Sequence, residues 1–244
     1  MDAGPGTPPE PGRTAIMETD AAARTSGNAH GMRPEELTDM RTYGGMTAEA
    51  RISARRRCIM ESGLELFSTL GYPQTSIRSV LRHSGVRERY FTESFSSLDE
   101  LMAAILREIQ EEETGRCREA LDAGGTRRDR ARGMLEVLTR GVTDDPRRSR
   151  VKLIESLSAG PLAASERRRG MRHLAALVES LLLEGWHDPE INTTAMSMAV
   201  VGGVNQILLN WVDGVIQTSR EDVVQQSLYL FEAIAEFGAG TPRT

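Results

Sequence analysis

The sequence predicts an all-α protein with about nine helices, on the strength of two observations. From residue 47 onward, apolar residues recur at three-, four- and seven-residue steps, and no stretch alternates with the two-residue period of a strand. Glycine, proline and capping residues interrupt this pattern at intervals of a helix length. We expect an arm over residues 1–44, a small helical domain over residues 45–96, and a larger helical domain over residues 97–240.

The arm differs in composition from the rest of the chain. Residues 1–44 are rich in proline, glycine, alanine, threonine and acidic residues, and they hold almost no large apolar side chains. Such a segment buries too little apolar surface to offset the entropy of ordering. We therefore predict that it is disordered.

The small domain is expected to hold one long helix followed by two short ones. The long helix ends at Gly71, a typical C-terminal cap, and a proline two residues later prevents its continuation. A short helix over residues 76–83 follows, with Thr75 as its cap. Gly85 then stands in a tight turn, where glycine can adopt a positive φ, and a second short helix covers residues 87–93.

The larger domain is expected to consist of longer helices. Ser97 and Glu100 form a capping-box pattern at the start of the first one, because the hydroxyl and the carboxylate can each satisfy a free backbone N–H. Apolar residues at helical spacing mark further helices near residues 134–138, 151–157, 171–182, 189–212 and 221–237.

Composition favours a soluble protein of the cytoplasm. Hydrophobic residues make up 39% of the chain and charged residues 27%. Cys58 and Cys117 have no second cysteine or histidine at a metal-ligand interval, so we expect packing roles and neither a disulfide nor a metal site. Residues 1–30 lack the apolar stretch of a signal peptide. The uncharged run over residues 191–212 carries too many polar groups for lipid, so we expect a buried helix and no membrane contact.

The basic residues concentrate in the small domain. The whole chain has a net charge of −5, but residues 45–95 hold eight arginines against five glutamates. Two short helices around Gly85, braced by the helix before them, match the helix-turn-helix arrangement, whose second helix enters the major groove of DNA. A local basic surplus on an acidic body is typical of an attached DNA-reading module. The sequence thus predicts a DNA-binding domain over residues 45–96.

A spaced pattern of residues, without insertions or deletions, supports this interpretation. It consists of Ile59, Gly63, Leu66, Phe67, Gly71, Tyr72, Thr75, Ser76, Ile77, Gly85, Val86, Arg89, Tyr90, Phe91, Glu93, Ser94, Phe95, Asp99, Glu100 and Leu101. With these residues the chain resembles the tetracycline-repressor-like (TetR) family of transcriptional regulators. The resemblance implies a helix-turn-helix domain joined to a helical domain that binds an effector and dimerises.

The residues expected to contact double-stranded DNA lie on the two short helices and near the start of the helix before them: Arg51, Arg55, Thr75, Ser76, Arg78, Arg82, Arg87, Glu88, Arg89 and Tyr90. Three positions depart from the family pattern. Arg87 replaces a capping serine, Thr92 replaces a tyrosine that contacts phosphate, and Leu98 replaces a lysine. The alternative is therefore a helical interaction protein that keeps the fold without binding DNA.

The resemblance also implies that the last two long helices pair with their copies in a homodimer. Both helices are apolar on more than one face, which exceeds the need of a single core. The expected interface residues are Ala199, Gly203, Val204, Ile207, Trp211, Val224, Leu228 and Phe231. A two-fold dimer reads a palindromic operator.

A cavity for an unidentified small apolar effector is expected among the middle helices. Its candidate lining residues, any one of which is better explained as ordinary core, are Met102, Leu106, Met134, Leu138, Ile154, Leu157, Met171, Leu174 and Val178. We expect a repressor that such a ligand releases from its operator.

An enzyme is the other class of function that we considered. The sequence holds no glycine-rich phosphate loop after a strand and no paired metal-ligand spacing. His173 and His187 have no partnered nucleophile in the sequence. We therefore expect no catalytic residue, no cofactor and no metal.

Overall fold

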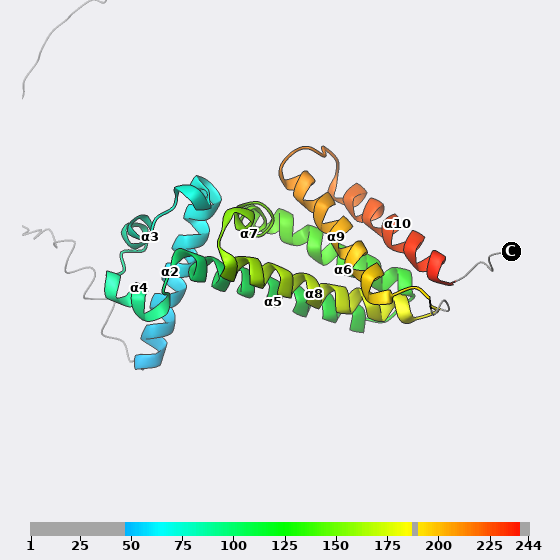
Figure 1. Ribbon diagram of the computed structural model, residues 1–244, viewed down its shortest axis with the longest axis horizontal. Coiled ribbons are helices and arrows are strands. Elements are labelled where there is room, and N and C mark those ends of the chain that lie inside the picture. The colour runs from blue at the N-terminus through cyan, green and yellow to red at the C-terminus, as the bar shows by residue number, and fades with distance from the viewer. Residues whose placement is uncertain (1–46, 187–189, 240–244) are drawn as a thin grey trace, which may run out of the picture. The chain divides into compact units, whose positions relative to one another are not determined.

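The computed structural model describes residues 47–186 and 190–239, which form nine α-helices, two short 3-10 helices and no strand (Figure 1). In chain order they are α2 (Ala48–Leu70), η1 (Tyr72–Gln74), α3 (Ile77–Ser84), α4 (Glu88–Ser94), α5 (Leu98–Asp122), α6 (Arg127–Asp144), α7 (Pro146–Leu153), η2 (Glu155–Ser158), α8 (Pro161–Leu183), α9 (Thr193–Val212) and α10 (Arg220–Ala239). The predicted all-α fold is confirmed for this part of the chain. The predicted disorder of residues 1–44 lies outside the described residues.

Helices α2, α3 and α4 pack around one apolar core. Phe67 from α2, Val80 from α3 and Phe91 from α4 are almost completely buried there. Gly71 ends α2 with a φ of 86°, and Gly85 ends α3 with a φ of 66°, in the left-handed region that favours glycine. The chain therefore turns sharply from α3 into α4, as in a helix-turn-helix (Figure 1).

The cap of α3 is Ser76, one residue later than predicted. The Ser79 N–H donates to Ser76 Oγ at 3.1 Å, and the Ser76 N–H donates to Ser79 Oγ at 2.9 Å, so the two residues form a capping box. The Thr75 hydroxyl instead donates to the Gly71 carbonyl at 2.9 Å, and its side chain is buried. The Thr75 hydroxyl thus stabilises the end of α2, and Ser76 caps α3.

Helix α5 runs from the helix-turn-helix into the larger helical domain. Its start matches the prediction, because the Glu100 N–H donates to Ser97 Oγ at 3.1 Å and the Glu100 carboxylate accepts from the Ser96 N–H at 2.7 Å. The first half of α5 packs on α2, where a Cβ at Gly63 would lie 2.9 Å from Leu101 Cδ2. The two helices therefore approach as closely as a glycine allows.

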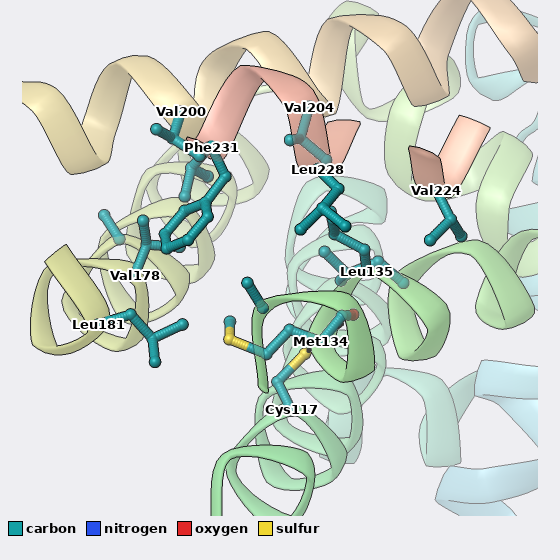
Figure 2. Close-up of a cluster of buried hydrophobic side chains, with 14 of the residues drawn as sticks. Cys117, Met134, Leu135, Val178, Leu181, Val200, Val204, Val224, Leu228 and Phe231 are labelled. Carbon is teal, nitrogen blue, oxygen red and sulfur yellow. Dashed lines mark hydrogen bonds between the residues drawn. The ribbon is translucent and has the colours of Figure 1, made fainter. Parts of the chain in front are cut away.

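A second apolar core lies between the end of α5 and helices α6, α8, α9 and α10. Figure 2 shows Val204 from α9 and Leu228 and Phe231 from α10 converging on Leu135 of α6 and Val178 of α8. All five side chains are buried. The last two helices thus use one face each to close the core of their own protomer.

Helix α7 and η2 lie between the two cores. Val151 belongs to the first core and Leu153 to the second. The sequence predicted one helix over residues 151–157, but the α-helix α7 ends at Leu153 and the 3-10 helix η2 follows it. This break places the buried Glu155 carboxylate 2.9 Å from the Tyr72 backbone N–H, which donates to it. Such a tertiary contact outweighs the local helical periodicity.

Helix α9 is the one helix of residues 47–186 and 190–239 that is long and apolar enough to cross a membrane, with a mean hydropathy of 1.3. It packs against α8 and α10, and Val200, Val204 and Leu208 are buried along one side of it. Only 28% of this apolar stretch is buried within the protomer, so the helix predicted to be buried is buried along one side only.

Candidate nucleic-acid interface and ligand cavity

Exposed arginines surround the helix-turn-helix. Arg51 lies at the start of α2, Arg78 and Arg82 on α3, Arg87 directly before α4, and Arg89 on α4, and all five are exposed. Phosphate contacts to DNA need cations presented on a rigid support. The three helices therefore present most of the predicted arginines in a form suited to DNA.

The Tyr90 ring contacts two of the arginines that were predicted to bind DNA. The guanidinium carbon of Arg55 lies 4.1 Å from the centre of the Tyr90 ring, and that of Arg89 lies 4.4 Å from it. Arg89 also donates a hydrogen bond to the Tyr90 hydroxyl. This hydrogen bond lowers the pKa of Tyr90 and raises the pKa of Arg89. The ring therefore connects the first turns of α2 to α4.

The remaining residues predicted to contact DNA differ in their exposure to solvent. Glu88 is exposed on α4, and Ser76 is exposed although its hydroxyl caps α3. Thr75 is buried and bonded to the end of α2. Arg56, which is not among the predicted DNA contacts, donates to the Ser94 carbonyl at 2.7 Å and stabilises the end of α4.

The three departures from the family pattern have local structural consequences. Arg87 occupies the N-cap position of α4 without a side-chain cap. The Thr92 hydroxyl donates to the Arg89 carbonyl at 2.9 Å, within its own helix. Leu98 packs against the first apolar core.

Polar contacts join α2 to α7 and η1 to η2. Arg147 of α7 lies 2.7 Å from the Glu61 carboxylate and 3.0 Å from that of Glu65, both on α2. Glu155 of η2 accepts the Tyr72 N–H at 2.9 Å. These partners are far apart in the sequence, so no local pattern predicts the contacts. They give the helix-turn-helix a second attachment to the larger domain, besides α5.

A cavity of about 250 Å³ lies inside the larger helical domain, between α5, α6, α7, η2, α8, α9 and α10. Its volume is close to the lower end of the range for small-molecule sites, about 300–1,000 Å³. Most of its lining is apolar. The predicted residues that line it are Met134, Leu138, Leu157, Met171, Leu174 and Val178.

Three predicted lining residues do not reach this cavity. Met102 and Leu106 are fully buried in the first core, because the first half of α5 faces the helix-turn-helix. Ile154 packs against the second core at the break between α7 and η2. Sequence reasoning also missed the walls from α9 and α10, where Val204 and Phe231 line the cavity.

The cavity has a polar part that sequence reasoning did not find. Gln110 Oε1, Arg167 Nε and Ser227 Oγ are shielded from solvent and have no hydrogen-bond partner among the described residues. Glu113 and Lys152, which also line the cavity, form a salt bridge with each other. Unsatisfied buried polar atoms are costly, so three of them around one cavity point to a ligand.

The predicted dimer residues divide between the interior and the surface of the protomer. Val204, Val224, Leu228 and Phe231 are buried in the second core, so their side chains leave no surface for a partner. Gly203 faces α10 of the same protomer, since a Cβ there would lie 2.7 Å from Leu230 Cδ2.

The other predicted dimer residues lie nearer the surface. Ile207 and Trp211 are half-buried against the second core, and Ala199 is exposed. The exposed side of α9 and α10 is uncharged in its middle part and acidic at both ends of α10, at Asp222 and Glu236. The uncharged exposed residues are Ala195, Ala199, Gln206, Gln226, Tyr229, Ala233 and Phe237, and Gly202 beside them is half-buried.

The two cysteines differ in environment. Cys117 is buried, and burial raises the pKa of its thiol to about 12, as expected for a packing residue. Cys58 is exposed, so its predicted packing role is wrong. Within residues 47–186 and 190–239, no group of three His, Cys, Asp or Glu residues is placed to hold a metal ion.

No protein-family model and no curated protein matches the sequence. Solved structures match the fold. The fatty acid degradation regulator FadR from Bacillus halodurans is 14% identical, with a TM-score of 0.64 over 72% of this chain and 94% of that chain. The regulator FadR from Bacillus subtilis, in complex with stearoyl-CoA, is 14% identical, with a TM-score of 0.62 over 73% and 97%. A TetR-family structure from Syntrophomonas wolfei is 15% identical, with a TM-score of 0.64 over 75% and 96%. The chain therefore has the TetR-like all-α fold.

Proposed function

We propose that this chain is a DNA-binding transcriptional regulator: a homodimeric repressor that a small, mainly apolar ligand releases from a palindromic operator. The observation that carries the proposal is the presence, in one chain, of a helix-turn-helix with exposed arginines and an apolar cavity in the helices that follow it. The fold supports the proposal, since the similar solved structures are transcriptional regulators.

In this proposal α4 enters the major groove and α3 lies across the DNA backbone. Arg87 and Arg89 reach phosphates or base edges from α4, and Arg78 and Arg82 contact phosphates from α3. Arg55 joins them through its stacking on Tyr90. Thr75 contributes by fixing the end of α2, because its hydroxyl is bonded inside the protein.

The homodimer is proposed to form through the exposed side of α9 and α10, which is uncharged between Asp222 and Glu236. Tyr229 is 54% exposed on that side, and Ala199 and Gly202 allow a close approach of backbones. Two copies related by a two-fold axis present two α4 helices to one face of DNA, at half-sites about 10 base pairs apart or a multiple of that.

The ligand is proposed to act through two connections between the cavity and the helix-turn-helix. Helix α5 runs from one to the other. The α7–η2 segment lines the cavity with Leu153 and Leu157. It contacts α2 through Arg147 and η1 through Glu155. A ligand that prefers one position of these elements changes the spacing of the two α4 helices, and a few kcal/mol of differential affinity suffices.

An apolar ligand is supported by the cavity walls and by one similar structure. The FadR regulator from Bacillus subtilis binds stearoyl-CoA, a molecule with a long apolar chain. We propose, further, that the protein acts in the cytoplasm without catalysing a reaction, as a soluble regulator of this kind would.

A gel-shift experiment with the DNA upstream of the protein's own gene tests the DNA-binding part. We expect a shifted band that weakens with Arg89→Ala and persists with Arg118→Ala, a control at an exposed arginine on α5. Binding should also fall steeply with salt, because arginines replace condensed counterions. No retention favours the alternative of a helical interaction protein that keeps the fold without DNA binding, as Thr92 and Leu98 would suggest. Equal retention of unrelated duplexes would show binding without sequence reading and contradict an operator.

A further inference from the structure

We propose that the effector is an amphipathic anion, with an acidic group held beside Arg167 and an apolar chain in the rest of the cavity. This inference rests on the proposed function and names the ligand class of its cavity. The apolar part follows from the walls, where Leu174, Val178 and Phe231 come from two different helices. The acidic part follows from the charges and the unpaired polar atoms of the lining.

The lining carries an excess of positive charge. Its charged residues are Glu113, Lys152, Arg167 and Arg168, one acid against three bases. Glu113 and Lys152 neutralise each other in a salt bridge whose side chains are only 16% and 14% exposed. No salt bridge joins Arg167 or Arg168 to a described residue, whereas the next residue, Arg169, pairs with two glutamates. Arg168 is exposed to solvent and Arg167 is half-buried, so Arg167 is the unpaired cation that the cavity partly shields from water.

One atom of Arg167 lacks a hydrogen-bond partner. Its Nε is shielded from solvent, and its N–H has no acceptor among the described residues. A buried donor on a cation is costly without an acceptor, and an anionic oxygen is the acceptor that satisfies both the hydrogen bond and the charge. A neutral alcohol offers only the hydrogen bond, and an ammonium ligand adds a like charge.

Gln110 supplies a second polar contact at the same end of the cavity. Its side chain is 7% exposed, and its Oε1 has no partner. The amide lies against Gly170, where a Cβ would come within 2.3 Å of Gln110 Cδ. Gly170 is three residues after Arg167 on α8, so the two residues share one side of that helix. The Gln110 amide thus lies next to the turn that carries the Arg167 guanidinium.

Ser227 offers a third group, from α10. It is fully buried, and its hydroxyl has no partner among the described residues. A hydroxyl can donate to or accept from a polar atom of the ligand. An entirely apolar ligand would leave the Arg167 Nε–H and the Ser227 hydroxyl, the two of these groups that can donate to an acid, without a partner.

Calorimetric titration of the full-length protein with three ligands of equal chain length tests the proposal. The ligands are decanoate, decanol and decylammonium, measured without DNA at pH 7.5. We expect decanoate to bind at least tenfold more tightly than decanol, and decylammonium to bind most weakly. Arg167→Gln should reduce decanoate affinity about ten- to a hundredfold, the effect of losing a hydrogen bond to a charged group, and leave decanol affinity unchanged. The matched control is Arg172→Gln, an exposed arginine on the same helix outside the cavity lining, and it should bind decanoate as the wild type does.

Four results would overturn the proposal: equal binding of decanoate and decanol, preference for decylammonium, no binding of any of the three, or equal affinities of the two variants. Thermal unfolding without ligand provides a further check. Arg167→Gln should melt at or above the wild-type temperature, because it removes a shielded Nε–H donor that has no acceptor among the described residues. A clear fall would instead assign Arg167 a structural role and contradict the proposal.

The test separates this inference from the proposed function. If the protein retains no DNA but prefers decanoate through Arg167, the regulator proposal fails and the ligand class stands. If the protein binds its operator and shows no preference for the acid, only the ligand class fails.

Discussion

Replacing Gly170 with alanine tests whether the Gln110 amide borders open space. The added Cβ would lie 2.3 Å from Gln110 Cδ, against 3.4 Å or more for an ordinary contact, so the amide must move by about 1.1 Å. Gln110 Oε1 makes no hydrogen bond, so this movement breaks none at that atom. The cavity offers the amide a space to enter.

The expected effect of Gly170→Ala on stability is small. Alanine favours a helix interior over glycine by about 1 kcal/mol, and an altered side-chain rotamer costs about 0.5–1.5 kcal/mol. The two terms nearly cancel, so the melting temperature should change by less than about 4 °C. Ligand affinity should fall more, because the displaced amide overfills the site, and overpacking costs about 1–3 kcal/mol, which is roughly five- to 150-fold.

Thermal unfolding and titration with decanoate measure the two effects separately. The control is Gly238→Ala, whose Cβ would lie 2.0 Å from Cε3 of Trp186. The indole is a rigid ring, so it has no internal rotation that could relieve this contact. That variant should lose about 1–3 kcal/mol of stability. If Gly170→Ala is destabilised as much as Gly238→Ala, the Gln110 amide is locked in a packed core, and the reasoning is refuted.

Three further predictions concern the DNA surface, the dimer and the dependence on pH. Arg89→Ala should weaken operator binding at least about tenfold in fluorescence anisotropy, while Arg118→Ala binds as the wild type does, because loss of a bidentate contact costs about 1–3 kcal/mol. Tyr229→Asp should yield a folded monomer in light scattering, since it places a charge on the proposed interface; an intact dimer would show that this surface is free. Hydrogen bonds from Arg147 lower the pKa of Asp145 in the folded protein. The ionised carboxylate therefore stabilises the fold at any pH above its unfolded pKa of about 3.9, and this stabilisation is lost as the pH falls through its folded pKa. Asp145→Asn should therefore make the unfolding free energy less dependent on pH below about 4, and an unchanged acid profile would contradict this.

Helix boundaries were the most predictable part of the fold. Gly71 and Gly85 end helices where glycine caps are expected, and Ser97 begins α5. Such signals are local, because a cap depends on a few consecutive residues. Thr75 and Ser76 show the limit: both suit a cap, and the bond from Thr75 to the end of α2 decides between them.

The faces of the last two helices were less predictable. A helix that is apolar all round has two candidate contact faces, and its sequence does not say which face packs inside the protomer. Val204 and Phe231 therefore carried the expected chemistry of an interface but lie in the core and line the cavity. The exposed side, with Ala199 and Tyr229, emerges only when α6 and α8 are placed.

The polar part of the cavity was not predictable from local patterns. Gln110, Arg167 and Ser227 lie on three separate helices, and each looks like an ordinary polar residue in its own segment. Their significance comes from being buried together without partners. That property belongs to the packing of the helices and not to any one of them.

Selection of bound duplexes from a random DNA library tests the central claim most directly, because it requires no knowledge of the operator. The full-length protein is incubated with the library, and bound duplexes are amplified and sequenced. The account predicts enrichment of a palindrome whose half-sites lie about 10 base pairs apart, or a multiple of that, and loss of the enrichment with Arg89→Ala. Recovery of no common sequence would contradict the account and would identify the chain as a helical protein that keeps the fold without reading DNA.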